Sequence, residues 1–182
     1  MKVQIIYSSL TGCTQRVAEA IFDGLKVENK SIHNLKDGEP VLDGDVILLG
    51  YWVDKGGPNN EMMELMKTIK NKAVGIFCTL GYYADSSHAQ QSVQKGLDFV
   101  KENNAIVGSY VCNGALSPKM IEGMRQGGAG HHSATPQKEI RWDIMKSHPT
   151  AAECSLAAER FVERIELYSR CCEQNLDFQS IL

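Results

Sequence analysis

The sequence lacks the features that mark several large classes of protein. No apolar run approaches the roughly 18 residues of a membrane-spanning helix, so we expect no membrane segment. The net charge is −3, from 19 basic and 22 acidic residues, and nucleic-acid binding usually needs a basic excess. A strand pattern begins at residue 3, which leaves no room for a signal peptide. We therefore predict a protein that binds neither membranes nor nucleic acids.

Metal-binding and disulfide patterns are also missing. The six cysteines, at positions 13, 78, 112, 154, 171 and 172, form no CxxC pair and have no zinc-ligand spacing. This cysteine usage predicts a reduced, cytoplasmic protein. His131 and His132 are adjacent, but they lie in a glycine-rich stretch that is typical of a solvated loop. We therefore expect no metal site.

What the chain does contain is a regular alternation of strand and helix patterns. Strands are predicted over residues 2–7, 31–35, 45–50, 72–79 and 105–112, and helices over 14–27, 60–69, 86–103 and 151–172. Nearly continuous apolar runs, such as Val46–Leu49 and Ala73–Phe77, are typical of strands covered on both faces. The alternation predicts an α/β fold: a doubly wound, five-stranded parallel sheet of order 2-1-3-4-5 with helices on both faces. We expect residues 1–182 to form a single domain.

One segment departs from the alternation. Residues 113–149 contain no strand pattern, yet Ser117-Pro118 and Thr135-Pro136 both resemble helix starts with a capping hydroxyl and proline at the first helical position. We interpret this segment as an elaboration between the last strand and the last helix, placed over the ligand-binding edge of the sheet.

The most informative motif is the turn Ser8–Thr14, which joins the first strand to the first helix. Ser9, Thr11 and Thr14 offer hydroxyl groups, and Gly12 allows backbone to approach a ligand closely. The helix start adds free N–H groups and the positive end of a dipole. The turn contains no lysine or arginine, and the chain has neither a Walker lysine motif nor a G-x-G-x-x-G turn. This pattern predicts phosphate binding by neutral donors.

Two further loops follow strands at the same edge of the predicted sheet. Gly50–Pro58 contains Tyr51 and Trp52, and Thr79–Asp85 contains a glycine followed by Tyr82 and Tyr83. Ligands of doubly wound sheets bind at the carboxyl ends of the strands, where these loops converge. A phosphate cradle beside aromatic faces fits a planar, phosphorylated heterocycle.

The segment Ser9-Leu10-Thr11-Gly12-Cys13-Thr14 resembles the phosphate loop of the flavodoxin family, [Ser/Thr]-x-Thr-Gly-x-Thr, in both pattern and position. The resemblance covers most of the chain outside residues 113–146 and implies FMN as the cofactor. It also implies that Trp52 and Tyr82 sandwich the isoalloxazine ring. No catalytic residue is expected, and the expected FMN-binding residues are Ser8, Ser9, Leu10, Thr11, Gly12, Cys13, Thr14, Tyr51, Trp52, Val53, Asp54, Thr79, Leu80, Gly81 and Tyr82.

The resemblance leaves the biological role open between three functions. The first is an electron carrier that shuttles electrons between a reductase and an acceptor enzyme, both of them protein partners. The second is an NAD(P)H-dependent FMN or quinone reductase, because the elaboration could cover a substrate site. The third is an accessory module that delivers FMN or docks to a larger reductase. The chain is less acidic than typical flavodoxins, and the oligomeric state stays open.

Overall fold

The computed structural model describes residues 1–127 and 133–181, and its centre is a parallel sheet. The strands are β1 (Val3–Tyr7), β2 (Lys30–Asn34), β3 (Val46–Asp54), β4 (Gly57–Pro58), β5 (Ala73–Leu80) and β6 (Ala105–Asn113). Five of them are parallel in the order β2-β1-β3-β5-β6, while the short β4 pairs antiparallel with the end of β3. This confirms the predicted doubly wound sheet, because β5 and β6 are the fourth and fifth strands of the predicted set.

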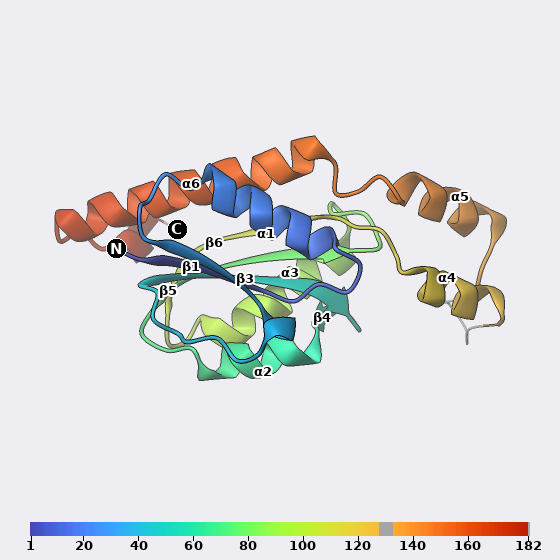
Figure 1. Ribbon diagram of the computed structural model, residues 1–182, viewed down its shortest axis with the longest axis horizontal. Helices are drawn as coiled ribbons and strands as arrows, with labels where there is room; N and C mark the ends of the chain where they lie inside the picture. Colours follow the sequence, from blue (N-terminus) through green and yellow to red (C-terminus); the bar gives the residue numbers. More distant parts are fainter. Residues whose placement is uncertain (128–132, 182) are drawn as a thin grey trace.

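Helices cover both faces of this sheet (Figure 1). The helices are α1 (Cys13–Gly24), α2 (Asn60–Thr68), α3 (Ser87–Val100), α4 (Pro118–Arg125), α5 (Pro136–Met145) and α6 (Ala151–Glu173), and short 3-10 turns occupy Leu35–Asp37 and Phe178–Ile181. Helices α1 and α6 lie on one face, and α2 and α3 lie on the other (Figure 1). No helix in the described part of the chain is long and apolar enough to cross a membrane.

Each face of the sheet has its own hydrophobic core. On one face, side chains of β1 and β5 pack against Val17 and Ile21 of α1 and Phe161 of α6. On the other face, alternate residues of β3 pack against Met62 and Met66 of α2. Because neighbouring residues of a strand point to opposite faces, a central strand covered on both sides must be apolar throughout. This is why the nearly continuous apolar runs predicted the strands well.

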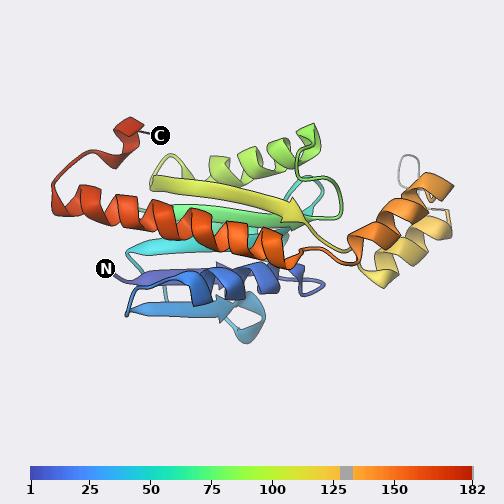
Figure 2. The same ribbon diagram turned by 90° about the horizontal axis from the view of Figure 1, so that it is seen from above.

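Helices α4 and α5 form between β6 and α6 and extend beyond the carboxyl ends of the strands (Figures 1 and 2). Both begin where the sequence indicated: the Ser117 hydroxyl accepts from the Met120 N–H at 3.2 Å, and the Thr135 hydroxyl accepts from the Lys138 N–H at 3.3 Å. We call residues 118–127 and 133–145 the α4–α5 lobe. That residues 1–182 form one domain stays a prediction, and His131 and His132 lie outside the described residues.

The segment predicted as a loop over residues 50–58 is largely strand, so this part of the prediction was wrong. Strand β3 continues to Asp54, because Tyr51 and Trp52 still pair with β5. The chain then turns back through Lys55 (φ 48°) and Gly56 (φ 77°) into β4. Two successive residues with positive φ are typical of a tight two-residue hairpin. Trp52 and Val53 therefore stand on a rigid strand end.

Candidate functional site

The Ser8–Thr14 turn lies where β1 ends and α1 begins. Gly12 precedes the helix with a φ of 84°, a left-handed conformation that suits glycine, and a Cβ added there would meet no atom within 4 Å. Among the described residues, no acceptor takes the backbone N–H groups of residues 9–15; the first bond of the helix runs from Arg16 N–H to Gly12 C=O at 3.0 Å. The turn therefore presents a set of unpaired N–H donors at a positive helix end.

The hydroxyl groups of this turn differ in what they already bind. Thr14 Oγ1 lies 2.9 Å from Thr79 Oγ1 at the end of β5, and both side chains are buried. Thr11 Oγ1 lies 3.3 Å from the Ala115 carbonyl oxygen, to which it donates. Ser9 is buried, and its Oγ has no partner among the described residues. Buried hydroxyls are normally hydrogen-bonded, so among the hydroxyls of this turn Ser9 is the one best placed to bind a ligand.

Ser8 is hydrogen-bonded to two side chains at the start of α2. Its Oγ accepts from Asn59 Nδ2 at 2.9 Å and donates to Glu61 Oε2 at 3.2 Å. These bonds tie the end of β1 to α2. In this structure the side chain of Ser8 supports the turn, although the sequence placed it among the cofactor-binding residues.

Cys13 connects the turn to the far end of the chain. Its sulfur accepts from the Ala115 N–H at 3.2 Å, and its thiol lies within donating distance of the His148 carbonyl oxygen at 3.5 Å. Arg16 donates to the Pro149 carbonyl oxygen nearby. Neither Ala115 nor His148 was predicted as a neighbour of this turn, because backbone contacts across more than one hundred residues leave no local pattern in the sequence.

A narrow cavity beside the turn brings together much of the predicted site. It is lined by seven of the predicted residues, namely Leu10, Thr11, Trp52, Val53, Thr79, Leu80 and Gly81, and by Gly114–Ser117 and Met120. Its volume is about 40 Å³, far below the roughly 300–1,000 Å³ of a typical small-molecule site. Leu116 causes this narrowness: a Cβ on Gly81 would lie 2.2 Å from its Cδ2. We call this space the ring cavity.

Two predicted residues, Tyr51 and Asp54, do not line the ring cavity. Tyr51 is fully buried beneath α3, where its hydroxyl donates to the Ser92 carbonyl oxygen at 3.0 Å. Burial raises the pKa of this phenol well above its ordinary value. Asp54 lines a separate hollow together with Lys95. Tyr51 lies outside the ring cavity because successive side chains of β3 alternate, so Tyr51 and Trp52 point to opposite faces of the sheet.

Tyr82 lies next to the ring cavity but faces the α4–α5 lobe. The guanidinium carbon of Arg141 lies 4.6 Å from the centre of its ring. The rings of Tyr83 and His88 meet Tyr82 edge to face, with centroid distances of 5.5 and 6.4 Å. Tyr82 therefore borders a wide groove between the sheet and the lobe, and in this structure it does not stand opposite Trp52 across the ring cavity.

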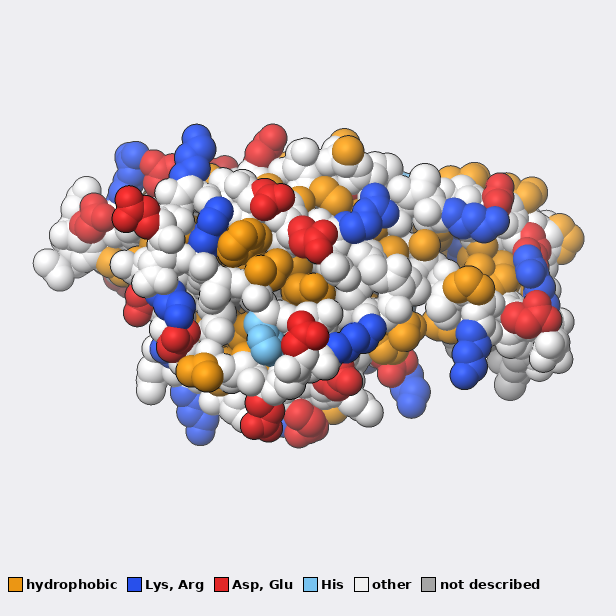
Figure 3. Space-filling view, in the orientation of Figure 1, with side chains coloured by type: hydrophobic (Ala, Val, Ile, Leu, Met, Phe, Trp, Pro, Cys, Tyr) orange, Lys and Arg blue, Asp and Glu red, His pale blue; other side chains and the backbone are white. Residues whose placement is uncertain are grey.

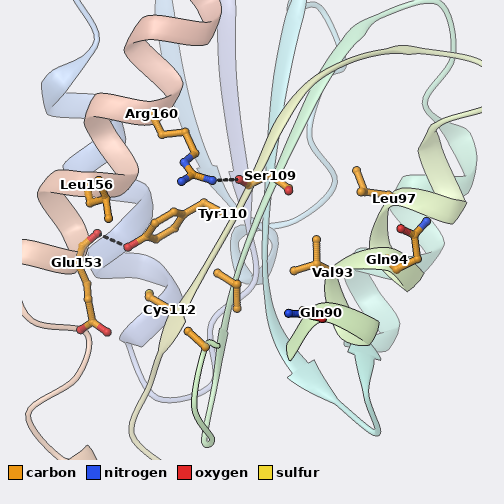
Figure 4. A pocket seen from close by; sticks show the side chains of 12 residues that line it. Gln90, Val93, Gln94, Leu97, Ser109, Tyr110, Cys112, Glu153, Leu156 and Arg160 are labelled. Atoms are coloured by element: carbon orange, nitrogen blue, oxygen red, sulfur yellow. Dashed lines mark hydrogen bonds between the residues drawn. The ribbon is translucent and has the colours of Figure 1, made fainter. Parts of the chain in front are cut away.

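Another large cavity opens at the outer edge of β6, between α3 and α6 (Figure 4). There the Tyr110 hydroxyl donates to the Glu153 carbonyl oxygen at 2.7 Å, and Arg160 Nη1 donates to the Ser109 carbonyl oxygen at 3.1 Å (Figure 4). None of the predicted site residues lines this cavity. No group of three or more metal-ligating side chains that could hold a metal occurs among the described residues.

The described residues fit the two ends of FMN differently. The phosphate end matches the unpaired N–H groups and the buried Ser9 hydroxyl, and Gly12 leaves space above the turn. The ring end has Trp52, Val53 and Gly81 in place, but Leu116 fills the space between Gly81 and the lobe. An isoalloxazine ring would fit between Trp52 and Gly81 only if Leu116 moved.

A doubly wound parallel sheet whose first strand leads through a turn of unpaired N–H groups into a helix is typical of α/β proteins that bind mononucleotides. The family model for the flavodoxin domain matches residues 4–163, and the chain belongs to the flavodoxin family. It is 34% identical over 128 residues to the flavodoxin-like domain-containing protein BilS of Clostridioides difficile (strain CD3), which covers 69% of this chain and 70% of that protein.

Solved flavodoxin structures share the fold. The Fusobacterium nucleatum flavodoxin bound to flavin mononucleotide superposes with a TM-score of 0.57 at 15% identity, covering 93% of this chain and 97% of that chain. Oxidised flavodoxin 2 from Bacillus cereus superposes with a TM-score of 0.55 at 19% identity, covering 90% of this chain and 99% of that chain. Family and fold support FMN as the cofactor.

Proposed function

We propose that this protein binds FMN noncovalently and carries electrons between a reductase and an acceptor enzyme. The observation that carries the proposal is the buried, unpartnered Ser9 hydroxyl beside the unpaired N–H groups of residues 9–15. Neutral donors of this kind hold a phosphate group without any lysine or arginine. When bound, FMN supplies the redox chemistry, and the protein positions and tunes it.

We propose specific roles for the residues around the ring. Leu80 and Gly81 offer backbone groups to the ring edge, and Trp52 offers an aromatic face. Thr14 and Thr79 bond to each other, so they hold the turn against β5 and leave the phosphate to Ser9 and to the backbone. The protein partners and the cytoplasmic location stay predictions.

The direct test is a titration of FMN-free protein with FMN, followed by quenching of flavin fluorescence. We expect saturable binding of one FMN per chain and much weaker binding of riboflavin, which lacks the phosphate. Equal affinity for the two flavins would remove the role of the Ser8–Thr14 turn. Absence of FMN binding would overturn the proposal as a whole.

The wide groove favours a second candidate function, an NAD(P)H-dependent flavin or quinone reductase. A dedicated carrier needs only an exposed flavin edge, whereas an enzyme needs a space for substrate. The groove beside Gly81 and Tyr82 has a volume of about 680 Å³, within the usual range for small-molecule sites. Oxidation of NADPH or NADH by FMN-loaded protein without an added reductase would establish the enzyme. No oxidation until a reductase is added would support the carrier.

A further inference from the structure

The groove between the sheet and the α4–α5 lobe has an unbalanced set of charges. We call it the lobe groove; its charged and ionisable lining residues are Lys55, His88, Lys138 and Arg141. No aspartate or glutamate is among the described residues that line it. Glu139, the acidic residue in the first turn of α5, is bound elsewhere: its carboxylate accepts from Arg125 Nε at 2.7 Å and from Nη2 at 2.6 Å. The lobe groove therefore has a positive lining.

Two buried N–H donors in this lining have no acceptor within the described part of the chain. They are Arg141 Nε and Trp142 Nε1, and Trp142 is only 3% exposed. A buried donor without an acceptor is destabilising, so a native protein usually pairs it with protein, water or ligand. The rest of the Arg141 guanidinium lies over Tyr82, and Arg141 forms no ion pair with a described residue. Lys138 differs, because its Nζ donates to the Ser133 carbonyl oxygen at 2.7 Å.

Apart from Ser86 and Ser87, the remaining walls of the lobe groove are largely apolar. Met120 and Met124 line it from the lobe, Leu116 lines it from the segment before α4, and Val53 lines it from β3. The surface is indented between the sheet and the lobe, and hydrophobic side chains gather on the lobe (Figure 3). Methionine side chains adapt to ligands of irregular shape. The lining thus combines a flexible apolar wall with a cationic end.

From this combination we propose that the lobe groove binds a small anionic molecule with an aromatic or otherwise apolar body, whose carboxylate or phosphate pairs with the guanidinium of Arg141. Its volume of about 680 Å³ lies within the usual range for sites that bind small molecules. The groove adjoins the ring cavity, and the two spaces share the lining residues Val53, Gly81, Leu116 and Met120. The inference goes beyond the proposed function, because the groove offers its own donors whether or not FMN is bound.

The test uses 8-anilinonaphthalene-1-sulfonate as an anionic probe and N-phenyl-1-naphthylamine as its uncharged counterpart. Binding to FMN-free and FMN-loaded protein is measured by isothermal titration calorimetry. We expect the sulfonate to bind to both forms and at least about tenfold more tightly than the amine, because only the sulfonate forms a charge-assisted hydrogen bond with Arg141. Equal affinities would show a merely apolar groove and overturn the proposal. If the sulfonate binds to FMN-free protein but not to FMN-loaded protein, the probe occupies the cofactor site, and this result would also overturn the proposal.

Variants locate the probe. Arg141→Gln is expected to weaken binding of the sulfonate about tenfold, and Met124→Glu to weaken it further by adding a negative charge to the wall. Arg160→Gln is the matched control, because Arg160 also lies over a tyrosine ring, that of Tyr110 at 5.7 Å, but at the β6 edge (Figure 4). Thermal unfolding checks that each variant is folded. An effect of Arg160→Gln without an effect of Arg141→Gln would move the anion site to the other cavity.

Competition experiments distinguish two sources of the anionic group. Displacement of the sulfonate by 2-naphthoate supports an aromatic carboxylate, and displacement by NADPH supports the phosphate of a dinucleotide. Failure of both competitors would overturn the assigned ligand chemistry. The outcome is independent of the FMN titration, because the binding of the probe is scored in FMN-free protein.

Discussion

Leu116, two residues before α4, lies against Gly81, the residue that follows β5: a Cβ on Gly81 would fall 2.2 Å from Leu116 Cδ2. Leu116 therefore occupies space beside a backbone segment that would face the ring of FMN. If FMN binds only to molecules in which Leu116 has moved away from Gly81, the observed affinity for FMN equals the intrinsic affinity multiplied by the fraction of such molecules.

We expect Leu116→Ala to raise the rate constant of FMN association severalfold, because the smaller side chain leaves the ring cavity open. Stopped-flow quenching of flavin fluorescence measures this rate. Leu156→Ala is the control, since Leu156 is half exposed on α6 and lines the cavity at the β6 edge. Unchanged or slower association in Leu116→Ala would mean that this leucine does not obstruct entry of the ring.

Ser9→Ala tests the phosphate end of the site. The variant removes a buried hydroxyl without a partner among the described residues, so the FMN-free protein should be as stable as the parent or slightly more stable. The dissociation constant for FMN should rise about tenfold, whereas that for riboflavin should stay the same. Ser31→Ala is a close control, because Ser31 Oγ is also buried and unpartnered but lies on β2. If the affinities for FMN and riboflavin fell equally, Ser9 would act on the flavin ring or on folding, and not on the phosphate.

Gly12→Ala should destabilise the FMN-free protein by about 1 kcal/mol, because alanine is strained at a φ of 84° even though its Cβ would contact nothing. Gly123→Ala provides the opposite expectation. Gly123 lies in α4 with open space around its Cβ position, so alanine should stabilise the helix by roughly 0.5–1 kcal/mol. Urea unfolding of both variants measures the two effects. Equal signs would contradict the backbone argument.

Tyr51 and Trp52 are expected to respond differently to substitution. Tyr51→Phe removes the bond to the Ser92 carbonyl oxygen and should cost about 1 kcal/mol of stability, with FMN affinity unchanged. Trp52→Leu should weaken FMN severalfold, because it removes an aromatic face from the ring cavity. Flavin titration and urea unfolding of each variant separate the two roles. If Tyr51→Phe lost affinity for FMN, Tyr51 would contribute to FMN binding as well as to the core.

The sequence predicted the sheet well because its evidence is local. Apolar runs such as Val46–Leu49 mark strands buried on both faces, and hydroxyl–proline pairs mark the starts of α4 and α5. The state of each hydroxyl could not be predicted in this way. Thr14 is engaged because Thr79 lies opposite it, and Ser9 is unpaired because no described acceptor reaches it. Such contacts depend on the packing of distant segments.

The same limit explains the partners of the aromatic residues. Tyr51 and Trp52 are adjacent in sequence, and only the extension of β3 to Asp54 shows that one enters the core and the other the ring cavity. Arg141 reaches Tyr82 from α5, a contact that no local pattern indicates. The lobe groove was therefore not predicted, although the sequence did indicate an elaboration at this edge.

At the start of α6, Glu153 closes a capping box with Thr150. Burial by itself raises the pKa of this carboxyl, but bonds from the Thr150 N–H at 2.6 Å and from His148 at 2.7 Å outweigh it, and the net pKa is lowered. A lowered folded-state pKa stabilises the protein above the unfolded value, and this contribution is lost as the pH falls through the folded value.

Glu153→Gln should therefore cost about 1 kcal/mol of stability at neutral pH, and the difference from the parent should shrink as the pH falls below about 4.3, the ordinary value for glutamate. Urea unfolding across this range measures the difference. Glu163→Gln is the control, because Glu163 is exposed on the same helix and forms no ion pair with a described residue. A difference that is constant with pH would mean that the amide perturbs packing, and that the charge of Glu153 adds nothing to the cap.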